Sequence, residues 1–551
     1  MLFKLLKSPA VLVPGLLAAF IGFASAQEAK TEPPSPPTEA KGGGRAGAPP
    51  RGEASPAGRA AAERATPRRL PADVVTRHKL ELPGGALAFT ATAGKIVLED
   101  AQGTAQGEIA FTAYALDGAE PRGRPVTFAV NGGPGASSAW LQIGALGPWR
   151  IAMGGEAATP SAAAALRDNP GSWLEFTDLV FIDPIGTGYS HGLAAPAATP
   201  SAGGGEEARR GRGGSASSGY WSVDGDIASL AEFVGRWLGK NARLGSPKFV
   251  IGESYGGFRG PKLVHELQTK QGVGINGLVL VSPVLDFAWL GEGGRNPMNW
   301  IVRLPTFAAT VREGKGPVAL KDLEDVERYA TGDYLKDLLS GDRDKAAVAR
   351  RAEQVAHITG LDPKLVLRHA GRISSDVFRR ERDRGSGFVA SAYDATDLIA
   401  DPYPESSRNR ADTGLGPLIA PFTTAMQELY GRRLNWQVEG RYHLLNTEVA
   451  RAWNYGPGGR AEQESVGDLR EALALDPKLR VLIAHGLSDL VTPYFQSKLI
   501  LDQVPIIGGT DRVRLTAYGG GHMFYSRDAS RAAFRADAQA LYKSALDGWG
   551  K

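Results

Sequence analysis

Short apolar segments that alternate with helical patterns constrain the fold of this 551-residue chain more than any other feature. The segments 125–130, 178–183 and 248–252 have the pattern of buried strands, and the stretch 224–238 repeats its apolar residues at helical spacing. Strands that alternate with helices form a mostly parallel sheet with right-handed crossovers. The chain is therefore predicted to be an α/β protein with a mostly parallel central sheet flanked by helices.

The strand–helix rhythm is interrupted once. From 286 to 475 the chain is polar, rich in helical patterns and broken by Pro and Gly, so we expect a helical cap inserted over the carboxyl edge of the sheet. The α/β domain then has two parts, 73–285 and 476–551. Further strands of this domain are expected at 78–90, 96–115, 277–282, 480–484 and 513–518. A helix is expected to start at 262–267, and a last helix is expected at 529–546.

The first 26 residues have the pattern of a secretory signal peptide. Lys4 and Lys7 precede an almost wholly apolar run at 9–23, and Ala24-Ser25-Ala26 offers small residues at a cleavage site. The apolar run is short for a membrane span and contains proline, although an uncleaved anchor is the alternative. We expect cleavage after Ala26, a periplasmic or secreted protein, and no stable membrane insertion afterwards.

Residues 27–72 form a stretch rich in Pro, Gly, Ala and Arg that cannot bury a core, so we expect a disordered basic linker. Its arginines supply much of the net charge of +4, which is small for this length, and no nucleic-acid partner is expected. The chain has no cysteine, which excludes disulfides. The sequence leaves the oligomeric state open.

A candidate nucleophile lies in Gly252-Glu253-Ser254-Tyr255-Gly256, which fits the G-x-S-x-G pattern between an apolar strand and a helix. A sharp strand-to-helix turn of this kind forces the serine into a strained backbone and exposes its hydroxyl at the top of the sheet. Glycines two residues before and after it let neighbouring backbone pass close by. The context predicts the α/β-hydrolase fold with Ser254 as nucleophile, and an ordinary tight turn is the alternative.

A serine hydroxyl needs a base, and the base needs an orienting acid. In this fold the acid precedes the histidine, and both follow the serine. Asp489 follows the expected strand 480–484 and His522 follows the strand 513–518, so we predict His522 as general base and Asp489 as its partner. His485 also lies at a strand end, but it precedes the acid and breaks the order.

The oxyanion formed during acyl transfer needs two backbone N–H donors. Tyr255, directly after the nucleophile, and Gly133, in the turn Asn131-Gly132-Gly133-Pro134-Gly135, are the predicted donors. That turn lacks the lysine of a phosphate-binding loop, and the pair at 265–266 lacks the second histidine of a zinc-protease motif. We therefore expect neither a cofactor nor a metal.

Four blocks together resemble the serine carboxypeptidase family, α/β-hydrolases that remove residues one at a time from the C-terminus of a peptide. They are Asn131–Gly135 with Ser137-Ser138, Asn169-Pro170 and Trp173 leading to Asp183–Ser190, Gly252–Gly257, and Gly521–Met523. The resemblance implies the same roles for Ser254, Asp489, His522, Gly133 and Tyr255. We expect a bacterial member that acts on a peptide or small ester substrate.

The resemblance also implies that Asn131 and Glu253 hold the terminal carboxylate of a substrate. A carboxylate beside Glu253 is repelled unless Glu253 is protonated and donates a hydrogen bond, which would favour acidic pH. The family usually has a second glutamate where this chain has Ala145, and Val-Pro where it has Phe524-Tyr525. The pair of carboxyl groups is thus one member short.

These observations predict a carboxypeptidase-like serine hydrolase that cleaves peptide bonds near the C-terminus through an acyl-enzyme on Ser254. One alternative is an aminopeptidase of the proline iminopeptidase type, which shares the Gly-Gly-Pro-Gly turn but commonly has a histidine where this chain has Asn131. An esterase or acyltransferase is another. A non-catalytic binding protein of the same fold is the alternative from a different class, and the complete set of triad residues argues against it.

Overall fold

The computed structural model describes residues 69–549, apart from 83, 154–158, 162–163, 194–218, 292–295 and 410–413. The predicted signal peptide at 1–26, with its cleavage site, and the linker up to residue 68 lie outside the described residues. Residues 69–72, predicted as the end of the linker, pack against the fold. Leu70 is buried, and its backbone N–H donates to the Glu108 carboxylate at 2.6 Å.

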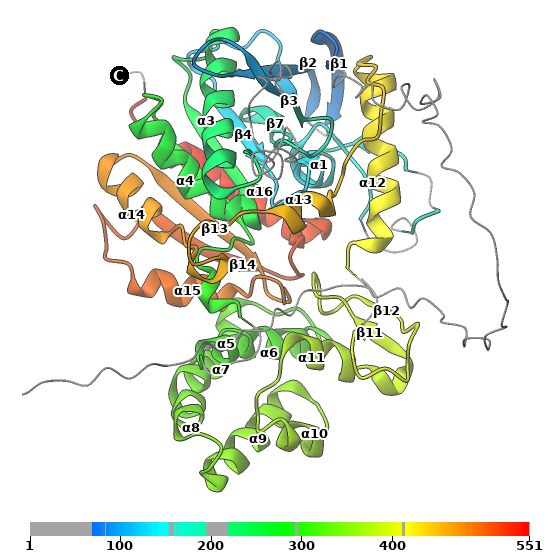
Figure 1. The fold of residues 1–551 in the computed structure, drawn as a ribbon, viewed down its shortest axis with the longest axis vertical. Coiled ribbons are helices and arrows are strands. Elements are labelled where there is room, and N and C mark those ends of the chain that lie inside the picture. Colours follow the sequence, from blue (N-terminus) through cyan, green and yellow to red (C-terminus); the bar gives the residue numbers. More distant parts are fainter. Residues whose placement is uncertain are drawn as a thin grey trace, which may run out of the picture. The chain divides into compact units, whose positions relative to one another are not determined.

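Ten strands of the described residues form one mixed sheet (Figure 1). They are β1 (Val74–Leu82), β2 (Gly85–Glu99), β3 (Ala105–Leu116), β4 (Val126–Val130), β7 (Asp178–Ile182), β8 (His191–Gly192), β9 (Lys248–Glu253), β10 (Gly277–Val281), β13 (Arg480–Gly486) and β14 (Val513–Tyr518). Their order is β1-β2-β3-β7-β4-β9-β10-β13-β14, with β8 paired to β3. Neighbours from β7 to β14 pair in parallel, and the earlier neighbours pair antiparallel. The predicted fold class is confirmed.

The start of the domain has three strands, whereas the sequence pattern predicts two. The expected strand 78–90 is split by a turn at Gly84 and Gly85, where the chain reverses from β1 to β2. β2 and β3 are joined at 100–104, where the Asp100 carboxylate accepts from the N–H of Thr104 at 2.8 Å. Glycine at a hairpin turn adopts a backbone conformation that costs other residues energy. The two glycines therefore explain why the expected strand is divided, and they mark the position of the turn in the sequence.

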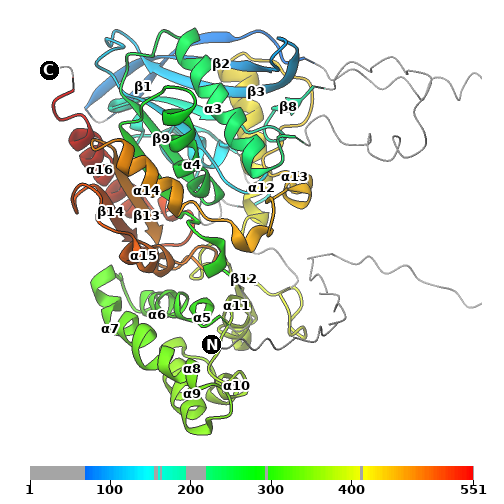
Figure 2. The ribbon, with the colours of Figure 1, turned by 60° about the vertical axis from the view of Figure 1, so that its left-hand side comes forward.

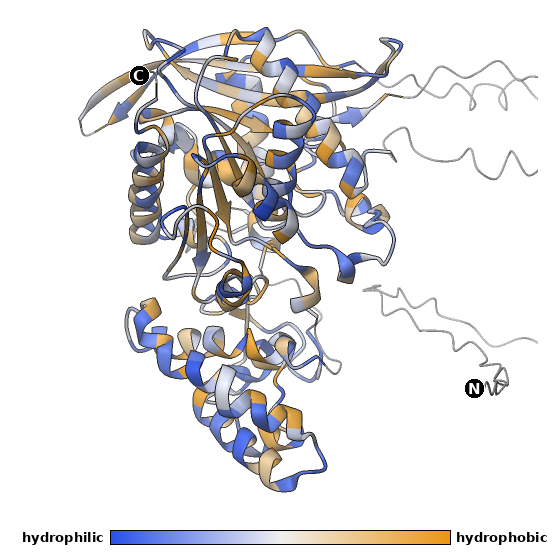
Figure 3. Ribbon diagram, turned by 90° about the vertical axis from the view of Figure 1, so that its left-hand side faces the viewer, coloured by the Kyte–Doolittle hydropathy of each residue, from blue (hydrophilic) through white to orange (hydrophobic). Residues whose placement is uncertain are grey.

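Helices cover both faces of the sheet (Figure 2). They are α3 (Val223–Lys240), α4 (Tyr255–Thr269) and α14 (Val466–Leu475) on one face and α16 (Asp528–Ala545) on the other, with α15 (Tyr494–Gln503) after β13. Successive residues of β9 alternate between two cores: Phe249 and Ile251 pack with α16, and Val250 packs with α3 and α4. The inner strands β4, β7 and β10 are buried along their whole length and mostly apolar, as expected where helices cover both faces of a sheet (Figure 3).

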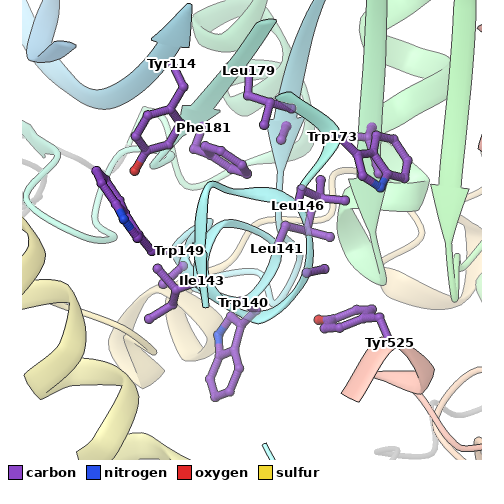
Figure 4. Close-up of a cluster of buried hydrophobic side chains, with 14 of the residues drawn as sticks. Tyr114, Trp140, Leu141, Ile143, Leu146, Trp149, Trp173, Leu179, Phe181 and Tyr525 are labelled. Atoms are coloured by element: carbon purple, nitrogen blue, oxygen red, sulfur yellow. The ribbon is translucent and has the colours of Figure 1, made fainter. Parts of the chain in front are cut away.

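The turn after β4 leads into a compact apolar segment. It forms α1 (Ala139–Leu141) and a π-helical turn, η3 (Gln142–Leu146), followed by the strand pair β5 (Trp149–Arg150) and β6 (Arg167–Asp168). Figure 4 shows Trp140, Ile143 and Trp149 projecting from this segment among buried aromatic side chains. The core on the face of the sheet that α16 covers therefore extends to the turn after β4.

The expected insertion at 286–475 divides into two parts. Its first part contains α5 (Met298–Ile301), α6 (Leu304–Glu313), α7 (Glu324–Tyr329), α8 (Leu335–Ser340), α9 (Lys345–Thr359), α10 (Pro363–Arg368), α11 (Ser375–Glu381) and the strand pair β11 (Phe388–Ala390) and β12 (Leu398–Ala400). These helices share a separate core that also takes in Leu487, Leu490 and Tyr494 of the α/β domain.

The second part of the insertion belongs to the core of the α/β domain, which differs from the expectation of a single cap. It contains α12 (Gly416–Glu428) and α13 (Thr447–Ala452) and runs into α14. The ring of Phe422 in α12 stacks on Trp140 with centroids 4.5 Å apart, and α14 packs against α4. Leu418, Phe422 and Met426 recur at helical spacing, but the sequence does not show which surface covers them.

Helix α4 begins at Tyr255, seven residues before the expected start at 262. Its first turn contains Gly256 and Gly257, which have low helix propensity and conceal the start of the helix in the sequence. In the described residues, no helix combines the length and the apolar character needed to cross a membrane.

Phe422→Ala is predicted to lower the free energy of unfolding by about 3–5 kcal/mol, because it leaves a cavity beside Trp140 in the core of the α/β domain. Chemical denaturation followed by tryptophan fluorescence measures this. Phe388→Ala removes an exposed ring of the same insertion and should change stability by less than about 0.5 kcal/mol. Equal effects of the two substitutions would contradict the placement of α12 in the core.

Candidate active site

Ser254 occupies the turn between β9 and α4 with φ of +61° and ψ of −117°. A non-glycine residue in this region of backbone space is strained, and the surrounding glycines make the turn possible. A Cβ on Gly252 would collide with the carbonyl of Gly256, and one on Gly132 would lie 2.5 Å from the backbone nitrogen of Tyr255. The structure thus places Ser254 at the sharp turn that the sequence pattern predicts.

The predicted acid and base lie in contact. Nδ1 of His522 is 2.8 Å from Oδ2 of Asp489, and both side chains are buried. A carboxylate at Nδ1 holds the proton on that nitrogen and leaves Nε2 as the acceptor. Burial by itself lowers the pKa of His522, but the Asp489 carboxylate and Glu253 outweigh it, so the pKa is raised.

Asp489 is oriented by the residues that follow it. Its Oδ1 accepts from the backbone N–H groups of Val491 and Thr492 at 2.8 and 3.0 Å, and the Thr492 hydroxyl donates to Oδ2 at 2.6 Å. Thr492 is not among the residues that the sequence motifs predict, although Asp is a residue type that commonly forms such side-chain-to-backbone turns.

His485, the competing histidine, is fully buried and does not line the pocket that holds Ser254. Its Nε2 lies 2.9 Å from the Ser497 hydroxyl, and burial lowers its pKa to about 4. It therefore stays neutral and lacks access to a substrate, which agrees with the assignment of His522 as base from chain order.

The insertion contributes Tyr393, which lies directly against the predicted base. The backbone N–H of His522 donates to the Tyr393 carbonyl at 2.5 Å, and the two rings meet edge to face with centroids 5.4 Å apart. Arg527 links the same loops, because it pairs with Asp394 at 2.8 Å and with Glu313 of α6. The sequence carries no local signal for these contacts, since they join segments more than a hundred residues apart.

The turn at 131–135 lies against the start of α4. Gly133 has a φ of +104°, and both Gly133 and Tyr255 line the pocket beside Ser254. The side chain of Arg259, which is 1% exposed, donates to the carbonyl of Asn131 at 2.5 Å and to that of Gly132 at 3.3 Å. The turn that carries the predicted oxyanion donor is thus attached to the helix that begins at the nucleophile.

Asn131 and Glu253 also meet in this pocket. Nδ2 of Asn131 donates to Oε2 of Glu253 at 2.9 Å, and the hydroxyl of Tyr525 lies 3.0 and 2.8 Å from the two carboxyl oxygens. Burial raises the pKa of Glu253 to about 7, although His522, Tyr525 and Asn131 act to lower it. Glu253 is therefore protonated at acidic pH and becomes an anion near neutrality.

The pocket has a volume of about 140 Å³ and mostly apolar walls. Trp140 comes from the segment after β4, whereas Phe287, Leu290, Tyr393, Leu415, Leu445 and Arg460 come from the expected insertion. A small cavity with apolar walls and a few polar groups is suited to one side chain of a substrate. Within the part of the chain that the structure describes, no group of three His, Cys, Asp or Glu side chains could hold a metal ion.

Comparisons with known proteins agree with the resemblance seen in the sequence. Residues 104–288 match the family model of serine carboxypeptidases. Serine carboxypeptidase-like 12 of Arabidopsis thaliana is 26% identical over 219 residues, which cover 37% of this chain and 43% of the relative. Serine carboxypeptidase-like 17 of the same plant is 26% identical over 264 residues, covering 46% and 51%. The matches thus span about half or less of these relatives, and the resemblance to the family is confirmed.

A solved structure shows the same fold over most of the chain. The prohormone-processing carboxypeptidase Kex1 of Saccharomyces cerevisiae superposes with a TM-score of 0.50 at 15% identity, covering 82% of this chain and 91% of that one. At this identity the likeness confirms the α/β-hydrolase fold.

Arg259→Met is predicted to cost about 3–5 kcal/mol of stability, because it leaves the carboxylate of Asp226 buried without the guanidinium that pairs with it at 2.5 Å. Arg236→Met is the matched control, since its pair with Glu232 on α3 is partly exposed and should be worth less than about 1 kcal/mol. Chemical denaturation measures both. A loss of similar size in the two variants would contradict the role of the buried pair.

Glu253→Gln is predicted to flatten the pH dependence of stability. The pKa of about 7 in the fold exceeds the 4.5 of a solvated glutamate, so between these values the folded chain binds more protons and stability falls as pH rises. The variant should therefore gain about 3 kcal/mol relative to the wild type between about pH 4 and about pH 8, and chemical denaturation at a series of pH values measures this gain. A constant difference across that range would contradict the burial of an ionising carboxyl group.

Proposed function

We propose that the chain is a carboxypeptidase-like serine hydrolase that cleaves peptide bonds near the C-terminus through an acyl-enzyme on Ser254. The observation that carries the proposal is the contact of 2.8 Å between buried Asp489 and His522, because His522 lines the same pocket as Ser254 at its strained turn. The family resemblance supports the reaction class.

In the proposed reaction, the Ser254 hydroxyl attacks the scissile carbonyl while Nε2 of His522 takes its proton. The carbonyl oxygen becomes an anion, which the backbone N–H groups of Gly133 and Tyr255 stabilise. His522 then donates the proton to the leaving amine, and the acyl group stays on Ser254. Water then attacks the acyl carbonyl and loses a proton to His522, which returns that proton to Oγ of Ser254 as the acid leaves. Asp489 stabilises the imidazolium in each half of the reaction.

Asn131 and Glu253 are proposed to bind the terminal carboxylate of the substrate. The amide of Asn131 is a donor at any pH, whereas Glu253 donates only in its protonated form. Because the pKa of Glu253 is raised to about 7, the protonated form prevails in acidic and mildly acidic solution. Binding of a free C-terminus is therefore expected to weaken as the pH rises through that value.

An aminopeptidase is a second candidate, and the same carboxyl group favours it under other conditions. Above its pKa, Glu253 is an anion in a small buried pocket and could pair with the amino group of a peptide. An esterase or acyltransferase would use the same triad without either contact. Mapping of the products of a peptide mixture by mass spectrometry separates these activities, because it shows which end is shortened.

Export to the periplasm or the exterior is also proposed. It is supported by the charged, apolar and small-residue pattern of residues 1–26. Detection of a chain that begins after Ala26 in a periplasmic or secreted fraction tests this proposal.

A fluorophosphonate probe is predicted to label the wild type and to leave Ser254→Ala unlabelled, since the probe reacts with an activated serine. Asp489→Asn should reduce the rate of labelling by roughly 10³–10⁴-fold, because the imidazole loses its orienting carboxylate. Equal labelling of wild type and Ser254→Ala would end the assignment of the nucleophile. Absence of labelling and of hydrolysis in all forms would favour a binding protein.

A peptide with a free C-terminus is predicted to be cleaved with at least about tenfold higher kcat/KM than its C-terminal amide at pH about 5. The amide cannot accept the hydrogen bonds of Asn131 and protonated Glu253 in the same way. Hydrolysis of both peptides is followed by liquid chromatography. An amide that is cleaved as fast as the acid would contradict recognition of the carboxylate.

A further inference from the structure

The hydroxyl of Tyr525 contacts both oxygens of the Glu253 carboxyl group, yet Tyr525 itself does not line the pocket. Tyr525 lies in η12 (Phe524–Ser526), directly after the loop that carries His522, and is fully buried. Within the part of the chain that the structure describes, neither lysine nor arginine pairs with Glu253. Its hydrogen-bond donors are therefore uncharged.

The ring of Tyr525 is held in place from two sides. A Cβ on Gly144 would lie 3.2 Å from Cε2 of the ring, so the ring packs directly on the η3 segment that contains Ala145. Arg531 donates to the backbone carbonyl of Tyr525 at 3.0 Å. Figure 4 shows the hydroxyl directed toward the segment at 139–146. The ring that carries this hydroxyl thus packs on Gly144, which directly precedes Ala145 in the sequence.

A phenol differs from a carboxyl group in one decisive property. Its hydroxyl can donate to an ionised Glu253 or accept from a protonated one, and it stays neutral because burial raises the pKa of Tyr525 well above its ordinary value. A second carboxyl group would share a proton with Glu253 and carry a charge of its own at higher pH. With Tyr525, the pair contains a single group that ionises near neutrality.

We propose that Tyr525 is a positioning residue: it holds the Glu253 carboxyl toward the pocket and makes carboxylate binding depend on one ionisation, that of Glu253. This rests on the proposed function, in which a substrate carboxylate binds at Glu253. The other ionising groups that act on Glu253 are His522 and Asp489, and Tyr525→Phe leaves both of them in place.

Tyr525→Phe removes the donor that stabilises the Glu253 anion, so the midpoint of Glu253 ionisation should move upward by about one pH unit. The infrared band of the protonated carboxyl group measures this midpoint without any substrate. The spectrum of Glu253→Gln is subtracted at each pH, so that the difference reports Glu253 alone. Tyr494→Phe is the matched control, because the Tyr494 hydroxyl donates to Glu327 at 2.9 Å in the core shared with the insertion. It should leave the Glu253 midpoint unchanged.

The second measurement is KM and kcat for an N-blocked peptide acid and for its methyl ester across the same pH range. Tyr525→Phe should raise KM for the acid by about five- to tenfold at low pH, because Glu253 is no longer held, with kcat changed less than about threefold. The pH at which KM for the acid rises should shift upward together with the infrared midpoint. KM for the ester should change neither with pH nor with the substitution. Labelling by the fluorophosphonate probe shows that each variant is folded.

An unchanged infrared midpoint in Tyr525→Phe, or a midpoint that moves equally in Tyr494→Phe, overturns the proposal. A wild type that cleaves acid and ester without distinction overturns the proposed carboxylate recognition, while the infrared midpoint still decides whether Tyr525 controls Glu253. A loss of activity on acid and ester alike in Tyr525→Phe, with the midpoint unmoved, would show a purely structural role and also overturns the proposal.

Discussion

The buried guanidinium of Arg259 joins three parts of the candidate site that are distant in sequence. It projects from α4, pairs with Asp226 of α3 and donates to the carbonyls of Asn131 and Gly132. A charge removed from water is tolerated only when a counter-charge and hydrogen bonds replace the lost hydration. These partners meet that condition only when the turn, α3 and α4 are packed together. Arg259 therefore links the turn that carries Gly133 to the helix that follows Ser254.

The loops of Asp489 and His522 depend in a similar way on the insertion. Tyr393 accepts the backbone N–H of His522, and the N–H of Ala395 donates to the carbonyl of Ser488 at 3.0 Å. Arg527 pairs with Asp394 and Glu313, so charges from the insertion brace the loop of the base. The insertion thus contributes to the geometry of the proposed triad as well as to the walls of the pocket.

Glu253 shows how a buried carboxyl group in the candidate site lowers the stability of the fold. Burial beside Ser254 raises its pKa to about 7, so the fold is less stable at neutral pH than it would be with a neutral side chain there. A fully solvated glutamate would avoid this cost but would be ionised in acid and would repel a substrate carboxylate. The neutral donors Asn131 and Tyr525 moderate the cost without adding a charge to the pocket.

The sequence by itself determined the α/β sheet, the turn of Ser254 and the order of Asp489 and His522. Each of these follows from local patterns: apolar strands, glycines around a strained residue, and loops at strand ends. Only the tertiary structure decided that Phe422 packs in the main core, that Tyr393 contacts the predicted base and that Tyr525 faces Glu253. These contacts join segments far apart in the chain. An aromatic residue has the same local pattern whether it fills a core or orients a reactive group, so packing alone distinguishes the two.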